Sequence, residues 1–179
     1  ETVKRVIKDG KTLGLLKTII QSNGKHQVGL PIGNLTSQWL ANLLLDRLDH
    51  FVKEKLRIPG YVRYMDDFVL FSNDKQQLKE AHKKVSEFLQ ETLLLKLKAS
   101  ATILGAAHHG LPFLGWRLSP GLRRLRPENL RRTQQRLKQR RWEYKIGIIT
   151  EGKLADIERS MFEHLKSGNT YRLRLKLIE

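Results

Sequence analysis

Two adjacent carboxylates, Asp66 and Asp67, stand in the middle of an otherwise apolar and aromatic stretch, residues 61–71. The aromatic and β-branched residues on both sides predict two short strands joined tightly at Met65-Asp66-Asp67. Adjacent carboxylates repel each other and lose hydration, and a hard divalent cation would offset both costs. Mg²⁺ takes one or two carboxylates together with substrate phosphates, and pairs of such ions serve phosphoryl-transfer enzymes. The alternative is an inert, solvated turn, which the dipeptide taken alone favours.

Three segments of the chain favour the enzymatic interpretation when they are taken together. Tyr64-Met65-Asp66-Asp67, a YMDD motif, resembles motif C of reverse transcriptases. Gly29-Leu30-Pro31-Ile32-Gly33-Asn34-Leu35-Thr36-Ser37-Gln38 resembles motif B, which holds the incoming nucleotide and the template. Leu111-Pro112-Phe113-Leu114-Gly115-Trp116 resembles motif E, the primer grip. The three motifs follow in the order and spacing of the family, and the resemblance covers essentially the whole chain.

The resemblance implies an RNA-directed DNA polymerase and a role for each matched residue. Asp66 and Asp67 would be the catalytic residues and metal ligands, with Asp66 the first choice. The nucleotide and template contacts would be Pro31, Ile32, Gly33, Ser37, Gln38, Tyr64 and Met65, and the primer grip would be Phe113, Leu114, Gly115 and Trp116. The reaction implied is nucleotidyl transfer from a dNTP to the 3′-OH of a DNA or RNA primer on an RNA template. Its cofactor would be Mg²⁺, two ions in the intact enzyme, with Mn²⁺ as a substitute.

The motif B segment is most similar to that of the reverse transcriptases of bacterial and phage diversity-generating retroelements. Group II intron and retron enzymes, the alternative lineage, more often end this motif in Ser-Pro, where this chain has Ser37-Gln38. Ile32 stands where most reverse transcriptases have a Gln that helps position the incoming nucleotide. An apolar side chain there should loosen geometric discrimination, so low-fidelity, mutagenic copying is expected. The resemblance also implies a cytoplasmic enzyme with a small basic accessory protein as partner.

The mechanism of the family needs a third carboxylate, from a motif A strand that precedes motif B. The one Asp before residue 29 is Asp9, in the polar, helix-breaking context Lys8-Asp9-Gly10. We therefore expect motif A and the fingers to lie outside this sequence, so that this chain alone should not polymerise although its parent should. Ala101 stands where many relatives have a lysine proposed to protonate pyrophosphate, and Lys98 is the candidate substitute. The alternative function is a non-catalytic, polymerase-like scaffold that binds nucleic acid.

The charge of the chain favours a nucleic-acid partner. Lys and Arg total 34 against 18 Asp and Glu, and residues 111–179 hold ten of the sixteen net positive charges. Clustered basic residues favour a surface that meets phosphates over a merely solvated one. The expected phosphate contacts are Arg124, Arg131, Arg132, Arg136, Lys138 and Arg140. The absence of Cys excludes disulfides and Cys-based zinc sites, and no apolar run is long enough to predict a membrane span.

The elements that must position these residues predict an α+β fold, a polymerase palm of antiparallel sheet and packed helices followed by a helical thumb. The palm is expected over residues 1–126 and the basic thumb over 127–179. Hydrophobic periodicity and capping residues predict helices over 2–21, 34–55, 75–92, 127–144 and 153–166. Besides the hairpin at 61–71, strands are expected at 94–98 and 102–104, with a second hairpin from 111–118 to 122–125. Trp39 is expected in the core.

Overall fold

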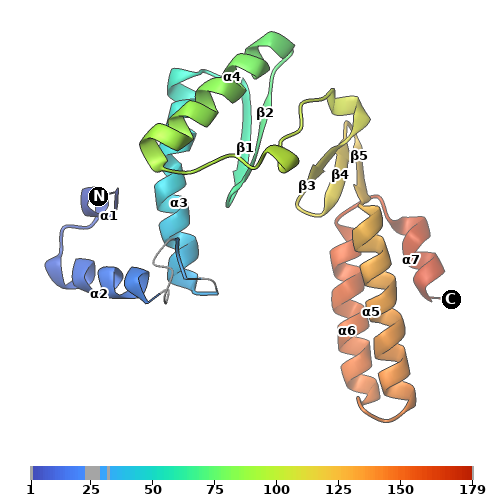
Figure 1. The fold of residues 1–179 in the computed structure, drawn as a ribbon. Helices are drawn as coiled ribbons and strands as arrows, with labels where there is room; N and C mark the ends of the chain where they lie inside the picture. Colours follow the sequence, from blue (N-terminus) through green and yellow to red (C-terminus); the bar gives the residue numbers. More distant parts are fainter. Residues whose placement is uncertain (1, 23–28, 32, 179) are drawn as a thin grey trace. The chain divides into compact units, whose positions relative to one another are not determined.

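The computed structural model describes residues 2–22, 29–31 and 33–178 (Figure 1). It forms two compact units, Glu1–Ile103 and Leu104–Glu179. Helices dominate both units, and each has one small antiparallel sheet, so the predicted α+β class is confirmed.

The first unit begins with two helices where one was predicted, α1 (Thr2–Val6) and α2 (Gly10–Gln21). The break falls at Asp9, whose carboxylate accepts a 2.7 Å hydrogen bond from the Thr12 backbone N–H and so caps α2. Hydrogen bonds from Thr12 lower the pKa of the Asp9 carboxyl. Asp9 therefore caps a helix rather than ending a strand, as its polar context predicted.

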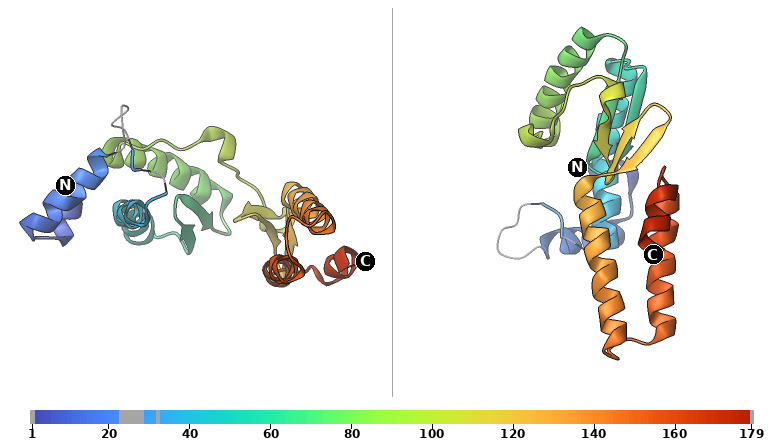
Figure 2. Two further views of the ribbon diagram at one scale, coloured as in Figure 1. Left: turned by 90° about the horizontal axis from the view of Figure 1, so that it is seen from below. Right: turned by 90° about the vertical axis from the view of Figure 1, so that its right-hand side faces the viewer.

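Two long helices and a hairpin make the core of the first unit. Helix α3 (Leu35–His50) continues as the π-helix η2 (Phe51–Lys55), and α4 (Lys75–Phe88) continues as the π-helix η3 (Leu89–Leu93). The aromatic rings of Phe51 and Phe88 stack, with 4.2 Å between their centroids, and so join the two helices. The hairpin of β1 (Gly60–Tyr64) and β2 (Asp67–Phe71) lies beside these helices (Figures 1 and 2), and its side chains pack against a shared cluster. The buried members of this cluster are Leu45, Leu48, Val52, Ile58, Ala81, Val85, Leu89 and Leu93.

The predicted strands at 94–98 and 102–104 are wrong. Leu94 ends η3 in the left-handed conformation, and from there to residue 106 the chain is irregular apart from a single 3₁₀ turn, η4 (Ala99–Ala101). A short apolar run cannot show whether a partner strand lies beside it, and none pairs with these segments among the described residues. Trp39 is 47% exposed, so its predicted burial is also wrong.

The first regular element of the second unit is the 3₁₀ turn η5 (Ala107–His109), which is followed by a three-stranded meander and three helices. The strands β3 (Leu111–Phe113), β4 (Trp116–Ser119) and β5 (Leu122–Leu125) pair in that order. One hairpin was predicted; a second turn at Leu114-Gly115, with positive φ at both residues, divides its first arm into two strands. The helices are α5 (Pro127–Lys145), α6 (Glu151–Lys166) and the unpredicted α7 (Tyr171–Ile178).

Helices α5 and α6 lie side by side and antiparallel (Figures 1 and 2). A small core of Leu137, Leu165 and Leu177 joins them to α7. Arg141 adds a polar tie, because its guanidinium donates to Glu158 Oε1 at 2.8 Å and to the Leu177 carbonyl at 2.8 Å. None of the described helices has the length and apolar character needed to cross a membrane.

Candidate active site

The carboxylate pair lies at the tip of the β1–β2 hairpin. The strands pair antiparallel from Gly60 opposite Phe71 to Tyr64 opposite Asp67, which leaves Met65 and Asp66 as a two-residue turn. The predicted tight connection is therefore confirmed, with Asp67 as the first residue of β2. Both carboxylates are exposed.

The turn requires an unusual backbone conformation at Met65, whose φ is 56°. A non-glycine residue at positive φ is disfavoured, so neighbouring groups must hold it there. Arg63 Nη1 donates to the Met65 carbonyl at 2.8 Å, and Asn42 Nδ2 lies 3.5 Å from Met65 Sδ. The turn is thus held from β1 and from α3.

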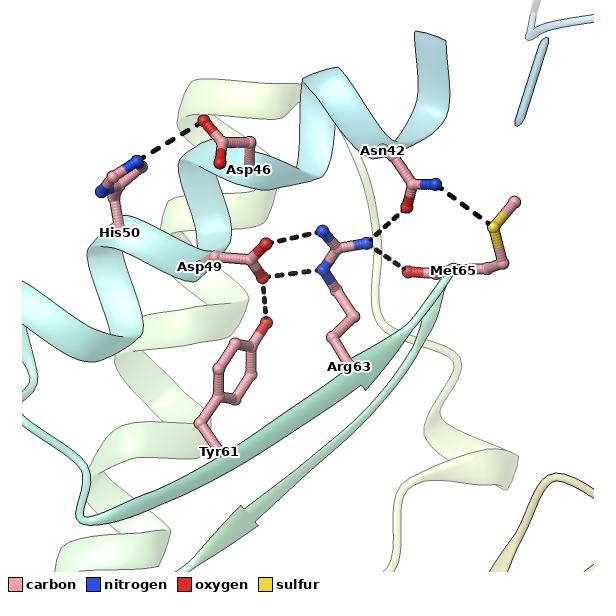
Figure 3. A network of polar contacts seen from close by, with 7 residues as sticks. All are labelled: Asn42, Asp46, Asp49, His50, Tyr61, Arg63 and Met65. Carbon is pink, nitrogen blue, oxygen red and sulfur yellow. Dashed lines mark hydrogen bonds and ion pairs between the residues drawn. The ribbon is translucent and has the colours of Figure 1, made fainter. Parts of the chain in front are cut away.

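Arg63 is in turn clamped by Asp49 of α3 (Figure 3). Its Nε donates to Asp49 Oδ1 at 2.7 Å and its Nη2 to Oδ2 at 2.6 Å, a bidentate geometry that combines strength with a defined orientation. The Tyr61 hydroxyl donates to the same Oδ1 at 2.6 Å, and Arg63 Nη1 also donates to Asn42 Oδ1 at 2.9 Å. One guanidinium therefore joins the hairpin, its turn and α3.

Burial and charge pairing set the ionisation of this network. The side chains of Arg63 and Asp49 are only 12% and 30% exposed. Burial acts to raise the pKa of Asp49, but hydrogen bonds from Arg63 and Tyr61 and the guanidinium charge outweigh it and hold that pKa below its usual value. Burial and the hydrogen bond to Asp49 raise the pKa of Tyr61, and the hydrogen bond to Asp49 raises that of Arg63. The pair consequently stays charged and Tyr61 stays protonated at neutral pH.

This network was not among the sequence-based predictions, although two patterns of residues point to it. Asn42 and Asp49 are seven residues apart, a spacing that places both on one face of a helix. Tyr61 and Arg63 alternate along a strand, a spacing that places both on one face of the hairpin, and Met65 follows two residues later in the turn. A polar pair on a helix face and an arginine within an aromatic strand indicate an ion pair between the two elements.

The described motif B residues lie at the start of α3. Pro31 is buried. Gly33 has a φ of 92°, and no atom of the described residues lies within 4 Å of an added Cβ, so its backbone conformation favours glycine. Ser37 is buried and Gln38 is exposed in the first turn of α3. Ile32 lies outside the described residues.

The motif E residues form β3, the β3–β4 turn and the first residue of β4 in the second unit. Leu114 is exposed at the tip, Phe113 is half-buried, and Trp116 is only 2% exposed. Asn129 of α5 donates to the Gly115 carbonyl at 2.9 Å and so fixes the turn. Trp116 is a core residue of this unit. Leu114 is the most exposed of the four residues predicted to form the primer grip.

The predicted phosphate contacts lie on β5 and α5. The exposed members are Arg124, Arg131, Arg132, Arg136 and Lys138. Arg140 differs from them, since its Nη1 donates to the buried carboxylate of Glu143 at 2.6 Å. Five of the six predicted residues therefore have exposed side chains.

The fit of a divalent metal ion depends on the carboxylates at the hairpin tip. Within the described part of the chain, no cluster of three or more His, Cys, Asp or Glu side chains could by itself hold a metal ion. Asp66 and Asp67 supply exposed carboxylate oxygens, the donors that Mg²⁺ prefers, and substrate phosphates and water can complete such a site. The donor set fits a cation that is shared with a phosphate substrate.

Comparison with known proteins agrees with the motifs. No curated protein matches the chain. The model of the family described as Reverse transcriptase (RNA-dependent DNA polymerase) matches residues 9–118, more than half of the 179, and includes the start of α3, the carboxylate turn and the β3–β4 hairpin. The chain belongs to the reverse transcriptase (RNA-dependent DNA polymerase) family.

Proposed function

We propose that the chain is the palm and thumb part of an RNA-directed DNA polymerase that transfers nucleotides from dNTPs to a primer 3′-OH. The main support is the exposed carboxylate pair, Asp66 and Asp67, at the tip of the β1–β2 hairpin. The largely buried ion pair between Arg63 and Asp49 attaches this hairpin to α3. The family match makes a polymerase site the most economical explanation for carboxylates in this position.

The residues at the turn would act by holding metal and substrate. Asp66 and Asp67 would bind divalent metal ions, which when bound activate the attacking primer oxygen and stabilise the departing pyrophosphate. Tyr64 and Met65 would contact the primer end and the incoming nucleotide. Ser37 and Gln38, at the start of α3, would contact the nucleotide and template.

The basic second unit would hold the primer–template duplex. The exposed residues Arg131, Arg132 and Arg136 of α5 would contact phosphates, which position a duplex without reading its sequence. Arg124 on β5 and Lys138 on α5 would add to the same electrostatic attraction.

Primer extension on an RNA template with Mg²⁺ tests this function. The assay compares the chain, a version that carries the upstream coding sequence, and that longer version with Asp66→Ala or Asp46→Ala. Extension by the longer version should fall about 10³-fold or more in Asp66→Ala, because charge stabilisation is lost. Asp46→Ala removes an exposed carboxylate of the same unit from a position outside the site, and it should extend primers at the parental rate.

The alternative function, a non-catalytic scaffold, has a different outcome in the same assay. A longer version that binds primer–template but never extends it, under Mg²⁺ or Mn²⁺, would exclude the polymerase. Binding that is unchanged in Asp66→Ala would then support the scaffold.

We further propose that the parent copies with low fidelity, as a cytoplasmic enzyme of the diversity-generating type with a small basic accessory protein. The support is the sequence form of residues 33–38 together with Ile32, where a hydrogen-bonding side chain is replaced by an apolar one. Ile32→Gln in the active longer version should lower the misincorporation frequency. An unchanged frequency would contradict the fidelity proposal and leave the group II intron and retron lineages as the better comparison.

A further inference from the structure

We infer that Arg63 is a positioning residue of the polymerase reaction, which holds the Met65-Asp66 turn at a set place on α3 with the help of Asn42 and Asp49. The inference rests on the proposed function, because it gives these residues a part in catalysis rather than in folding alone. It assigns no direct contact with substrate to any of the three.

The local sequence of the turn does not by itself select its conformation. Two-residue hairpin turns favour Asn-Gly, Asp-Gly or Gly-Gly, because they need positive φ, and this turn has Met-Asp with a Met65 φ of 56°. Left alone, such a turn would exchange among conformations that move the Asp66 carboxylate. Contacts from outside the turn must therefore select the observed one.

Those contacts converge on one guanidinium. Nη1 of Arg63 donates both to the Met65 carbonyl at 2.8 Å and to Asn42 Oδ1 at 2.9 Å (Figure 3). Its Nε and Nη2 both donate to the Asp49 carboxylate, and these two bonds fix the plane of the guanidinium. The planar fork of arginine can make all these bonds at once, whereas a lysine ammonium is a point charge without that geometry.

Helix α3 connects this network to the other half of the proposed site. Asn42 lies five residues after Ser37 on the same uninterrupted helix, and the proposed nucleotide contacts Ser37 and Gln38 occupy its first turn. Because an α-helix is rigid over this length, the network ties the metal-binding turn to the nucleotide-binding end of α3. A displacement of about 1 Å at a reacting group can cost about 100-fold in rate.

Arg63→Lys in the full-length protein tests the inference. Lysine keeps a positive charge opposite Asp49 but lacks the fork that reaches the Met65 carbonyl. We expect kcat for primer extension to fall about 10- to 100-fold and the Mg²⁺ concentration for half-maximal rate to rise, while the KM for dNTP stays within about threefold. Hydrogen exchange at the backbone amides of residues 64–67 should become faster.

A matched control exists in the second unit. Arg141 also donates to a carboxylate, that of Glu158, and to a backbone carbonyl, that of Leu177, both at 2.8 Å. Arg141→Lys should leave kcat, the Mg²⁺ requirement and exchange at the turn at wild-type values. An effect of Arg141→Lys equal to that of Arg63→Lys would show a general loss of stability and overturn the inference.

Asn42→Ala keeps the test decisive if Arg63→Lys does not fold. This variant leaves the Asp49–Arg63 pair in place and removes only the contacts of Asn42 with Arg63 and Met65, so it should lower kcat and loosen the turn to a smaller extent. Wild-type kcat and wild-type exchange in a folded Arg63 or Asn42 variant would overturn the inference. If the unaltered full-length protein extends no primer, the proposed function fails, whereas exchange at the turn still reports whether Arg63 holds it.

Discussion

At position 168 the ring of Trp116 leaves room for no side chain larger than hydrogen. A Cβ built on Gly168 would lie 2.2 Å from one ring carbon of Trp116 and 2.9 Å from the Arg123 carbonyl oxygen. The ring also contacts the Arg123 guanidinium, 4.7 Å from its centroid, and the His164 ring, whose centroid is 5.6 Å away. The buried indole of the motif E segment thus packs against β5, the last turn of α6 and the residues that follow α6.

Gly168→Ala should destabilise the second unit by about 1–3 kcal/mol, because the ring and the backbone must move apart to admit a methyl group. Urea unfolding followed by circular dichroism measures the change. Gly152→Ala is the control, since an added Cβ there meets nothing within 4 Å and alanine is the better helix former. A Gly168→Ala protein as stable as the Gly152→Ala protein would contradict the packing described here.

At the scale of elements, both long helices of the first unit loosen into π-helical turns before they end. Helix α4 and its continuation η3 end at Leu94, which has φ 56°, ψ 33° and 86% of its surface exposed. The next residue, Leu95, donates its backbone N–H to the Leu89 carbonyl at 2.9 Å. The left-handed end is therefore imposed by backbone hydrogen bonding and not by packing of the Leu94 side chain.

Leu94→Gly should stabilise the first unit by about 1 kcal/mol, because glycine adopts the left-handed conformation without the steric cost that leucine has there. The midpoint of urea unfolding should rise. Leu95→Gly provides the comparison. Leu95 is not one of the described residues with a positive φ, so glycine gains no conformational advantage there and the midpoint should fall. A fall in both variants would mean that the side chain of Leu94 contributes more than its exposure indicates.

Helix α3 also carries a histidine between two acidic residues one turn away on either side. His50 Nδ1 lies 2.7 Å from Glu54 Oε1, and Nε2 lies 3.5 Å from Asp46 Oδ2. The hydrogen bond with Glu54, followed by the charges of Asp46 and Glu54, raises the pKa of His50 above its usual 6.5. The protonated ring therefore stabilises this end of the helix.

Because the pKa of His50 is raised by folding, its contribution to stability is fully present below about pH 6.5 and is lost as the pH rises through the raised value. An NMR titration of the imidazole protons should give a pKa above 6.5. Glu54→Gln should lower that pKa more than Asp46→Asn does, since the hydrogen bond is the larger cause. An unshifted pKa in the unaltered protein would show that the two contacts do not persist in solution.

At the scale of the whole molecule, positive charge is concentrated beyond residue 110. The net charge of the chain is +16, and ten of these charges fall in residues 111–179. The basic side chains at 131, 132 and 136 are exposed on α5, whereas Arg140 and Arg141 are engaged with Glu143 and Glu158. Arginines on one helix thus divide between structural ion pairs and exposed cations available to phosphates.

Binding of an RNA–DNA duplex should weaken steeply with salt. On a B-form duplex each phosphate that is neutralised contributes about −0.9 to the slope of log K against log salt. Five or six contacts therefore give a slope of about −5. Changing Arg131, Arg132 and Arg136 together to Gln should reduce the slope by about 3. The same net change made on α4, at Lys79, Lys83 and Lys84, should leave the slope nearly unaltered. Equal effects of the two triple variants would indicate attraction by total charge without a defined surface on α5.

Features that depend on local chemistry were predictable from the sequence. Asp74 caps α4, Pro127 begins α5, and the Asp-Asp pair falls in a tight turn, because capping, proline geometry and turn formation involve residues close together in the chain. Three motifs with ordered spacing were also enough to indicate the reverse transcriptase family, because each motif is a short pattern of residue types that can be recognised in the sequence.

The contacts between residues that are distant in the chain could not be predicted from the sequence. Among the described residues, no strand pairs with the segments 94–98 and 102–104, where strands were expected. Trp39 is exposed while Trp116 is buried, and Arg63 contacts Asp49 and Asn42 of a helix earlier in the chain. Strand pairing, burial and ion pairing depend on neighbours that are distant in sequence. Their energies arise only when the chain has closed the intervening loops, so no local pattern contains them.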